Sequence, residues 1–380
     1  MNWVAWKMLT GNRGKYVGII MGVMFGAFLI AQQSSVFCGL MLLTTSQIKD
    51  IEGAEIWVMD KNMQYVDDIK PMSENELYRV RGVTGVDWAV RLYKGITRAR
   101  LDDGTFQQII MIGIDDATMV GAPRHVLVGS LDDLRRPDAV LMDEAGFRQL
   151  WPGEPLAAGK VFEMNDRRAV VVGVCKSRKT FMTFPIIYTR YSQAVSYVPM
   201  ERKVLSFVLA NPQPGLSAEE VCRRIEQQTS LQAKTRDQFT WTTIWYYMRK
   251  TGIPFNFGTV VLLGFIVGAA ICAQTFYMFT LENLRQFGAL KAMGARNGQL
   301  VRMILLQAFT VGFIGFGLGA GLAAVVFGEI IMKRVDKLAF YMPPQVLIGT
   351  GAAILVMVSI SSLFSIWRVV RLEPAVVFKG

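Results

Sequence analysis

The residue types that most often carry catalysis or bind metal ions are scarce in this chain. His125 is the only histidine among 380 residues, so neither a Ser-His-Asp arrangement nor a zinc site built from histidine and cysteine clusters has enough material. Residues 153–160 look like a phosphate-binding loop, but five residues separate the glycines instead of four, and Val161 follows the lysine. We therefore expect a turn before a strand there, and no enzyme activity in this chain.

Acidic pairs and cysteines are the remaining candidates for chemistry. Paired carboxylates could bind a hard cation, but solvated loop charge is their more common role, so we expect no metal site. The pairs are Asp67/Asp68, Asp102/Asp103, Asp115/Asp116 and Asp132/Asp133. Cys38 and Cys272 fall in apolar runs and are expected to pack as small apolar side chains. Cys175 and Cys222 could form a disulfide if their compartment is oxidising, but two separate thiols are the favoured interpretation.

Four stretches without Asp, Glu, Lys or Arg set the architecture that must position any site. They cover residues 16–43, 251–281, 303–328 and 338–367. Each exceeds the roughly 20 residues that a helix needs to cross about 30 Å of hydrocarbon. A charge at the bilayer centre costs about 2.5–3.5 kcal/mol, so we expect membrane helices at 16–43, 251–281, 303–332 and 338–367. The first run is too long for the apolar core of a signal peptide, which is the alternative.

The net charge of +11 is concentrated beside these runs. Residues 44–250 hold 28 Lys and Arg against 26 Asp and Glu, which argues against nucleic-acid binding. Ten flanking basic residues would share the side of both termini, and three would face the opposite side, which predicts cytoplasmic termini and an outer middle domain. The ten are Lys7, Arg13, Lys15, Arg285, Lys291, Arg296, Arg302, Arg368, Arg371 and Lys379; the three are Lys333, Arg334 and Lys337.

The middle region, residues 44–250, is expected to be a large α+β domain outside the cytoplasm. Strand-like segments at 54–60 and 204–210 are each followed by a helix pattern and another strand-like run. Two such βαβ units far apart in the sequence predict one split layer built from both ends of the domain.

The stretch between these units, about residues 95–203, reads as a β-rich insertion. Asn165 and Asp166 predict a hairpin turn within it. The basic and aromatic segment 178–191 is expected to be an edge strand packed on the domain, and a loop that contacts a partner is the alternative.

Polar and small residues inside the apolar runs predict contacts between helices. Polar groups in a membrane helix prefer a protein neighbour over lipid, and small residues four apart allow close approach of two helices. A dimer interface or packing within one bundle would both use these residues. They are Gln32, Gln33, Ser34 and Ser35 in the first run, and Gly317 and Gly321 in the third.

The segment 282–302 joins the second and third runs and has an amphipathic pattern. Leu281, Leu284, Phe287, Leu290 and Met293 recur every three residues, with polar and charged residues between them. This spacing predicts a short helix at the membrane surface that ends at Gly294. Such a helix could contact a cytoplasmic partner, or the segment could only hold the topology. Residues 1–15 and 368–380 are expected to be a cytoplasmic amphipathic segment and a cytoplasmic tail.

This segment resembles the signature of the FtsX/MacB-like permeases, the four-helix membrane subunits of type VII ABC transporters. Matching residues are Glu282, Gly288, Leu290, Lys291, Ala292, Gly294 and Ala295, whereas Gln286 stands where the family usually has Glu. Residues 368–375 resemble the family's C-terminal Pro-Ala ending. The layout of one helix, an outer domain and three helices covers the whole chain, and residues 264–268 and 290–294 look most like DevC-type permeases.

The resemblance implies a homodimeric permease in the bacterial inner membrane, with a periplasmic domain. A separate cytoplasmic ATPase would bind ATP and magnesium, so no cofactor is expected in this chain. Motion would pass through the membrane helices to the periplasmic domain, a mechanism termed mechanotransmission. The residues implied to couple to the ATPase are Glu282, Arg285, Gln286, Phe287, Gly288, Leu290, Lys291, Ala292, Met293, Gly294 and Ala295.

Similar proteins of the DevC and MacB types act with a periplasmic adaptor (a membrane fusion protein) and an outer-membrane channel. Efflux in such a tripartite system is therefore the function that the resemblance implies. Lipoprotein release or regulation of a cell-wall hydrolase by an FtsX-like complex is the alternative. A membrane-anchored sensor is a third reading, disfavoured because the cytoplasmic segments are short.

Overall fold

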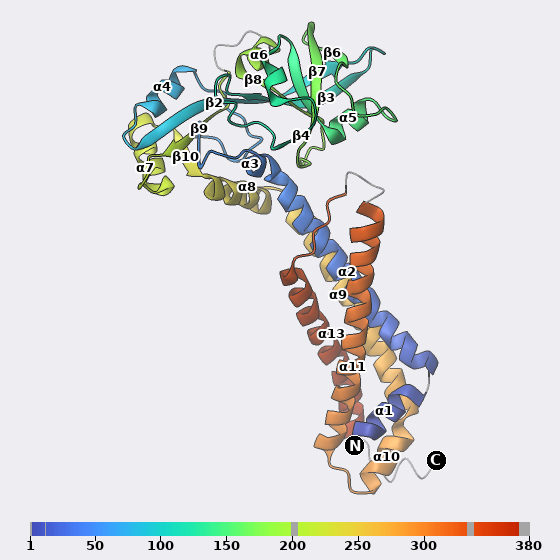
Figure 1. The fold of residues 1–380 in the computed structure, drawn as a ribbon. Coiled ribbons are helices and arrows are strands. Elements are labelled where there is room, and N and C mark those ends of the chain that lie inside the picture. The colour runs from blue at the N-terminus through green and yellow to red at the C-terminus, as the bar shows by residue number, and fades with distance from the viewer. Residues whose placement is uncertain (1, 12, 199–203, 333–337, 372–380) are drawn as a thin grey trace. The chain divides into compact units, whose positions relative to one another are not determined.

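The computed structural model describes residues 2–11, 13–198, 204–332 and 338–371, and the chain forms two compact units (Figure 1). The membrane unit comprises residues 1–40 and 252–380, and the sheet unit comprises Met41–Thr251. Several residues used above to predict topology and family lie outside the described ranges. They are Lys333, Arg334, Lys337, Pro374, Ala375 and Lys379.

Within the described ranges, four helices are long and apolar enough to cross a membrane. The spans are Tyr16–Thr44, Ile253–Glu282, Asn297–Ile331 and Pro344–Val370. The third span begins six residues before the predicted start at residue 303. The difference arises because the helix includes Arg302 near its N-terminal end, where a long cationic side chain can reach the polar interface. The helices are α1 Asn2–Gly11, α2 Arg13–Thr44, α9 Ile253–Glu282, α10 Leu284–Ala292, α11 Asn297–Ala323, its π-helical continuation η2 Ala324–Ile331, and α13 Pro344–Val370.

Close packing of α2 against α11 depends on glycines other than those predicted. A Cβ placed on Gly319 would lie 2.5 Å from the Met24 carbonyl oxygen, and one on Gly315 would lie 2.7 Å from the Val23 Cβ. Around Gly317 and Gly321, in contrast, a Cβ would meet nothing within 4 Å. The prediction that Gly317 and Gly321 pack helices within the chain is therefore wrong, because they lie on the opposite side of α11. Their role in a dimer stays a prediction.

The polar cluster of α2 is divided between interior and surface. Ser35 is fully buried, and its carbonyl oxygen accepts a hydrogen bond from the Tyr341 N–H at 3.0 Å. Gln32, Gln33 and Ser34 are half-buried. Ser35 therefore cannot contribute side-chain surface to a dimer interface as predicted, whereas the other three residues retain exposed surface.

The sheet unit is built on one mixed ten-stranded sheet (Figure 1). Its order is β10-β1-β9-β2-β3-β8-β5-β7-β4, and β6 pairs with β2 and β7. The strands are β1 Ile56–Met59, β2 Val86–Arg100, β3 Phe106–Ile114, β4 His125–Val128, β5 Ala139–Asp143, β6 Val161–Met164, β7 Arg167–Lys176, β8 Ile186–Arg190, β9 Phe207–Pro212 and β10 Gln232–Thr235. The helices are α3 Ser46–Asp50, α4 Asn75–Arg81, η1 Leu131–Arg135, α5 Glu144–Leu150, α6 Tyr191–Ser196, α7 Ala218–Thr229 and α8 Arg236–Lys250.

The two faces of β1 carry separate apolar cores, because successive side chains of a strand point to opposite faces. Ile56 and Val58 pack with α4 and α7, including Cys222, whereas Trp57 belongs to the core that contains Cys175. Both thiols are unbonded. The possible disulfide between Cys175 and Cys222 is therefore absent, and the favoured interpretation of two separate thiols is confirmed, since the sheet separates the two cysteines.

The strand β8 corrects the expectation for residues 178–191. It runs parallel to β3 and antiparallel to β5, and Ile186–Thr189 are buried, so it is an interior strand and not an edge strand. The predicted hairpin turn between β6 and β7 is confirmed. Asn165 and Asp166 have φ values of 48° and 59°, the left-handed geometry that a two-residue hairpin of this type requires.

Asp67 is also not the solvated loop charge that the sequence predicts. Its Oδ1 lies 2.5 Å from the ammonium of Lys94, a buried residue of β2, which also donates to the Val66 carbonyl oxygen at 2.9 Å. The pair ties the loop after β1 to the centre of the sheet.

Candidate functional site: the helix between α9 and α11

The candidate site is α10, a nine-residue helix between two long apolar helices of the membrane unit. Isolated helices of this length are marginal in water, so packing must stabilise it. Phe287 supplies that packing, because it is fully buried among residues of three other helices. These neighbours are Ala5 of α1, Leu300, Met303 and Ile304 of α11, and Val369 of α13.

The C-terminus of α10 is closed by two backbone hydrogen bonds. The Gly294 N–H donates to the Lys291 carbonyl oxygen at 3.1 Å, and the Ala295 N–H donates to that of Leu290 at 3.0 Å. This pattern is a Schellman motif, in which the residue after the cap adopts a left-handed conformation. Gly294 has a φ of 94°, which only glycine adopts without strain. The predicted end of the helix at Gly294 is therefore confirmed.

Lys291 attaches α10 to the last membrane helix. Its ammonium donates a hydrogen bond to the Val370 carbonyl oxygen at 2.9 Å, at the C-terminal end of α13. The negative end of the α13 dipole also stabilises a cation at this position. The side chain that resembles a family signature residue thus points back into the membrane unit.

The predicted coupling residues divide into two groups. Those that face the unit are buried or half-buried: Phe287, Gly288, Leu290, Lys291 and Ala295. Those that are exposed are Glu282, Arg285, Gln286, Ala292, Met293 and Gly294. Met293 is 75% exposed and does not continue the apolar stripe as predicted, because the helix ends at Ala292 and the chain turns at Gly294. The second group forms a surface of mixed polarity that can bind another protein.

The N-terminal helix α1 belongs to this site, which the sequence reading did not foresee. Ala5 and Leu9 are buried, and the Gln307 side chain of α11 donates to the Ala5 carbonyl oxygen at 2.8 Å. A cavity of about 500 Å³ separates α1 from the start of α10, with Trp3, Lys7, Glu282 and Gln286 in its lining. The spacing of Ala5 and Leu9, four residues apart, was the available signal.

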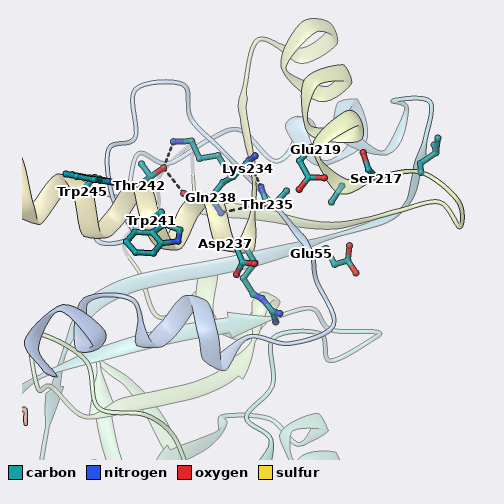
Figure 2. Close-up of a pocket in the computed structure, with 13 residues that line it drawn as sticks. Glu55, Ser217, Glu219, Lys234, Thr235, Asp237, Gln238, Trp241, Thr242 and Trp245 are labelled. Atoms are coloured by element: carbon teal, nitrogen blue, oxygen red, sulfur yellow. Dashed lines mark hydrogen bonds between the residues drawn. The ribbon is translucent and has the colours of Figure 1, made fainter. Parts of the chain in front are cut away.

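A second surface of interest lies along α8 of the sheet unit (Figure 2). A cavity of about 950 Å³ there is lined by Trp241 and Trp245, which are 60% and 50% exposed, and by charged residues of both signs. The Lys234 ammonium donates to the Thr242 hydroxyl at 2.9 Å, and burial lowers the pKa of Lys234 (Figure 2). The sequence reading missed both tryptophans.

Neither surface has a recognisable catalytic arrangement. The lining of the two cavities contains no histidine or cysteine. Within the described ranges, His, Cys, Asp and Glu side chains nowhere gather in a group of three that could hold a metal ion.

Two family models match the chain. Residues 17–228 match the MacB-like periplasmic core domain, and residues 239–374 match the FtsX-like permease C-terminal domain. The curated relatives include the macrolide export ATP-binding/permease proteins MacB of Escherichia coli K12 and Shigella flexneri, each 23% identical over 198 residues. These matches cover 50% of this chain and 30% of each relative, so the chain spans under a third of their length.

Parts of two solved structures are also similar to this chain. The periplasmic region of MacB from Actinobacillus actinomycetemcomitans has a TM-score of 0.39 and 14% identity, over 51% of this chain and 94% of that one. The extracellular domain of the noncanonic ABC-type transporter YknZ from Gram-positive bacteria has a TM-score of 0.35 and 16% identity, over 48% and 98% of the two chains.

Proposed function

The chain belongs to the family of MacB-like proteins with an FtsX-like permease C-terminal domain, and from that premise we propose that it is the permease subunit of an ABC transporter. In this proposal the four apolar helices cross the bacterial inner membrane. One precedes the sheet unit in the sequence, and three follow it. Both termini face the cytoplasm and the sheet unit lies in the periplasm. The basic residues beside α1, α10 and the start of α11 support this orientation.

The observation that carries the proposal is the double character of α10. Phe287 is fully buried in a cluster of α1, α11 and α13, while Met293 at the other end of the same helix is 75% exposed. A force applied to the exposed surface therefore reaches three helices of the unit. We assign that surface to a separate cytoplasmic ATPase, which binds ATP and magnesium, so this chain hydrolyses nothing itself.

The helix α9 is the element that we propose carries motion outward. It ends directly before α10, with only Asn283 between them, and its 30 residues span about 45 Å at 1.5 Å per residue. Only Thr251 and Gly252 separate it from α8 of the sheet unit. A helix resists compression along its axis, so displacement of α10 is transmitted to that junction.

The test is substitution of the exposed end of α10. Met293→Asp is expected to weaken binding of the partner ATPase by at least about tenfold, as loss of an interface anchor does, and to abolish stimulation of its ATP hydrolysis. Met182→Asp, the same change at a 43% exposed methionine of the sheet unit, is the control and should leave both unchanged. Normal stimulation in the Met293→Asp complex would remove the coupling role of α10.

Two further variants separate contact from attachment. Gly294→Pro is incompatible with a φ of 94°, and Lys291→Glu removes the bond to Val370. Both should uncouple ATP hydrolysis from transport, since they alter how α10 is held. Lys291→Glu should in addition leave ATPase binding unchanged, because Lys291 is not part of the exposed surface. Unchanged export by both variants would show that the attachment is not required.

We propose that the complex is a homodimer and part of a tripartite export system with a periplasmic adaptor and an outer-membrane channel, as in DevC-type and MacB-type systems. The exposed polar surface of α2 and the open glycine side of α11 are available for the dimer. The MacB relatives are named for macrolide export, which supports efflux. Affinity purification that recovers an adaptor favours export, whereas recovery of a lipoprotein chaperone or a hydrolase activator favours the alternative FtsX-like roles.

A further inference from the structure

A cavity of about 310 Å³ in the sheet unit has a strongly basic lining. It lies where α3, the approach to β4, and the end of β7 meet, and His125 and Lys176 are register partners on the paired strands β4 and β7. Five of the lining residues are basic: Lys49, Arg124, His125, Lys176 and Arg178. The volume is at the small end of the range of ligand pockets, which suits a compact group.

The acidic residue of this cavity is already neutralised. Asp50 Oδ2 accepts hydrogen bonds from the Ser177 hydroxyl at 2.9 Å and from the Arg178 N–H at 2.8 Å, and its Oδ1 lies 3.3 Å from Arg178 Nε. Arg124 pairs with Glu52. Within the described part of the chain, Lys49 and Lys176 have no carboxylate within ion-pair distance. Asp50 therefore orders the Ser177–Arg178 segment and leaves the positive charge of the two lysines uncompensated.

Hydroxyl groups complete the lining. Ser177 Oγ and Tyr188 OH are 2.8 Å apart, and both residues line the cavity. Because the Ser177 hydroxyl donates to Asp50, it accepts the second hydrogen bond from the Tyr188 phenol. Burial raises the pKa of Tyr188 well above its usual range, so the phenol keeps the proton that it donates. The two hydroxyls therefore order the wall of the cavity, and the cationic side chains are the groups that can bind phosphate oxygens.

We propose that this cavity binds a phosphate group, that of an anionic lipid headgroup or a free phosphate ion. Lys49 follows the end of α2 at Thr44 by only five residues, and α2 is one of the four candidate membrane spans. The chain thus holds one side of the cavity close to the end of a candidate membrane helix, and its cationic side chains can bind the phosphate of an anionic headgroup there. This site does not depend on the transport function proposed above.

The experiment uses the full chain in two settings. Native mass spectrometry of protein from nanodiscs of phosphatidylcholine with phosphatidylglycerol measures retained anionic lipid. Broadening of the ³¹P signal of inorganic phosphate measures free phosphate binding in detergent. The variant Lys49→Gln/Lys176→Gln is expected to reduce binding by about tenfold or more, since each basic residue near an anionic surface contributes about a fivefold effect. The control Lys61→Gln/Arg167→Gln removes two charges from exposed positions elsewhere on the sheet unit.

The outcomes distinguish the two sources. Retention of phosphatidylglycerol that the double variant loses identifies a lipid headgroup, and phosphate broadening that the double variant loses identifies a free ion. Both results together mean that the cavity binds the phosphate group from either source. The proposal is overturned if the wild-type chain binds neither probe, or if the control pair lowers binding as much as the Lys49/Lys176 pair does.

Discussion

The two units differ most in the apolar side chains that they leave exposed. The sheet unit buries large apolar residues such as Trp57, Phe207 and Phe239, whose rings pack 5.2–5.9 Å apart. The membrane unit buries some large apolar residues, but it also exposes others: Phe255, Phe313 and Ile348 are 81%, 78% and 72% exposed. Its buried residues include polar side chains within the apolar spans, among them Ser361, Ser362, Ser365 and Gln307.

This difference shows which forces stabilise each unit. In water, removing apolar surface from solvent drives the sheet unit together. In lipid that force is absent between helices, so close packing and hydrogen bonds must act instead. The Ser361 hydroxyl of α13 donates to the Ala269 carbonyl oxygen of α9 at 3.2 Å, and the two helices pack extensively against each other. Lys94 and Asp143 are among the buried polar residues of the sheet unit, and each has an ionisable side chain.

The strongest challenge to this comparison is removal of the partner of Lys94. Asp67→Ala leaves a buried ammonium without its carboxylate and is expected to lower the free energy of unfolding by about 3–5 kcal/mol. Chemical unfolding of the full chain in detergent, followed by tryptophan fluorescence, measures it. Asp68→Ala, which removes a more exposed pair with Lys70, should cost below about 1 kcal/mol.

A second variant tests whether an apolar side chain at position 94 stabilises the sheet unit as well as the Lys94–Asp67 ion pair does. Lys94→Met in the Asp67→Ala background replaces the unpaired cation with an apolar side chain and should restore most of the lost stability. If the double variant remains as unstable as Asp67→Ala, the ion pair itself stabilises the fold, beyond removing the cost of an unpaired buried charge.

The buried carboxyl of Asp143 makes the stability of the sheet unit depend on pH. Burial raises its pKa from 3.8 to about 6, although the N–H groups of Gly146 and Ile186 donate to its carboxylate and act in the opposite direction. Between pH 3.8 and 6 the folded state therefore holds a proton that the unfolded state has lost. Stability from this group is complete below pH 3.8 and falls by about 2–3 kcal/mol as pH rises through 6.

The check is the pH dependence of unfolding in Asp143→Asn. The neutral amide cannot ionise, so the decline between pH 4 and 6 should be smaller than in the wild type. Asp87→Asn, at an exposed carboxylate, is the control and should keep the wild-type slope. A decline that persists unchanged in Asp143→Asn would assign it to another group.

The smallest expected effect concerns the membrane unit, where replacing a glycine should lower stability only on the side of α11 that packs against α2. Gly319→Ala places a Cβ against the Met24 carbonyl oxygen and Ala27, and is expected to cost about 2 kcal/mol through overpacking. Gly317→Ala meets nothing within 4 Å and should be neutral or slightly stabilising, because alanine favours helix. Thermal unfolding of both variants in detergent measures the difference; equal effects would contradict packing of α2 on α11 by glycine.

Local chemistry made several features predictable. The four spans follow from charge-free runs, because a charge in hydrocarbon is costly wherever the helix lies in the bundle. The end of α10 at Gly294 and the turn at Asn165–Asp166 follow from residues that adopt left-handed backbone. The division of α10 into a buried and an exposed side was only partly predictable, because the position of Met293 depends on where the helix stops.

Contacts between distant segments were not predictable. Asp67 and Lys94 are 27 residues apart, and nothing in either sequence context marks them as a pair. The separation of Cys175 from Cys222 depends on which face of the sheet each occupies. The contribution of α1 to the α10 site depends on packing across more than 280 residues of chain.

The amino-acid sequence by itself determined that this chain enters lipid, where its helices begin and end within a few residues, and which short helix carries the exposed surface between α9 and α11. These properties depend on hydropathy and backbone preference, which act within a few residues. Tertiary structure alone decided which glycine side of α11 faces α2, where Lys94 finds its counter-charge, and how α10 is attached through Phe287 and Lys291. These depend on which surfaces meet after folding, and packing of distant segments leaves no local pattern along the chain.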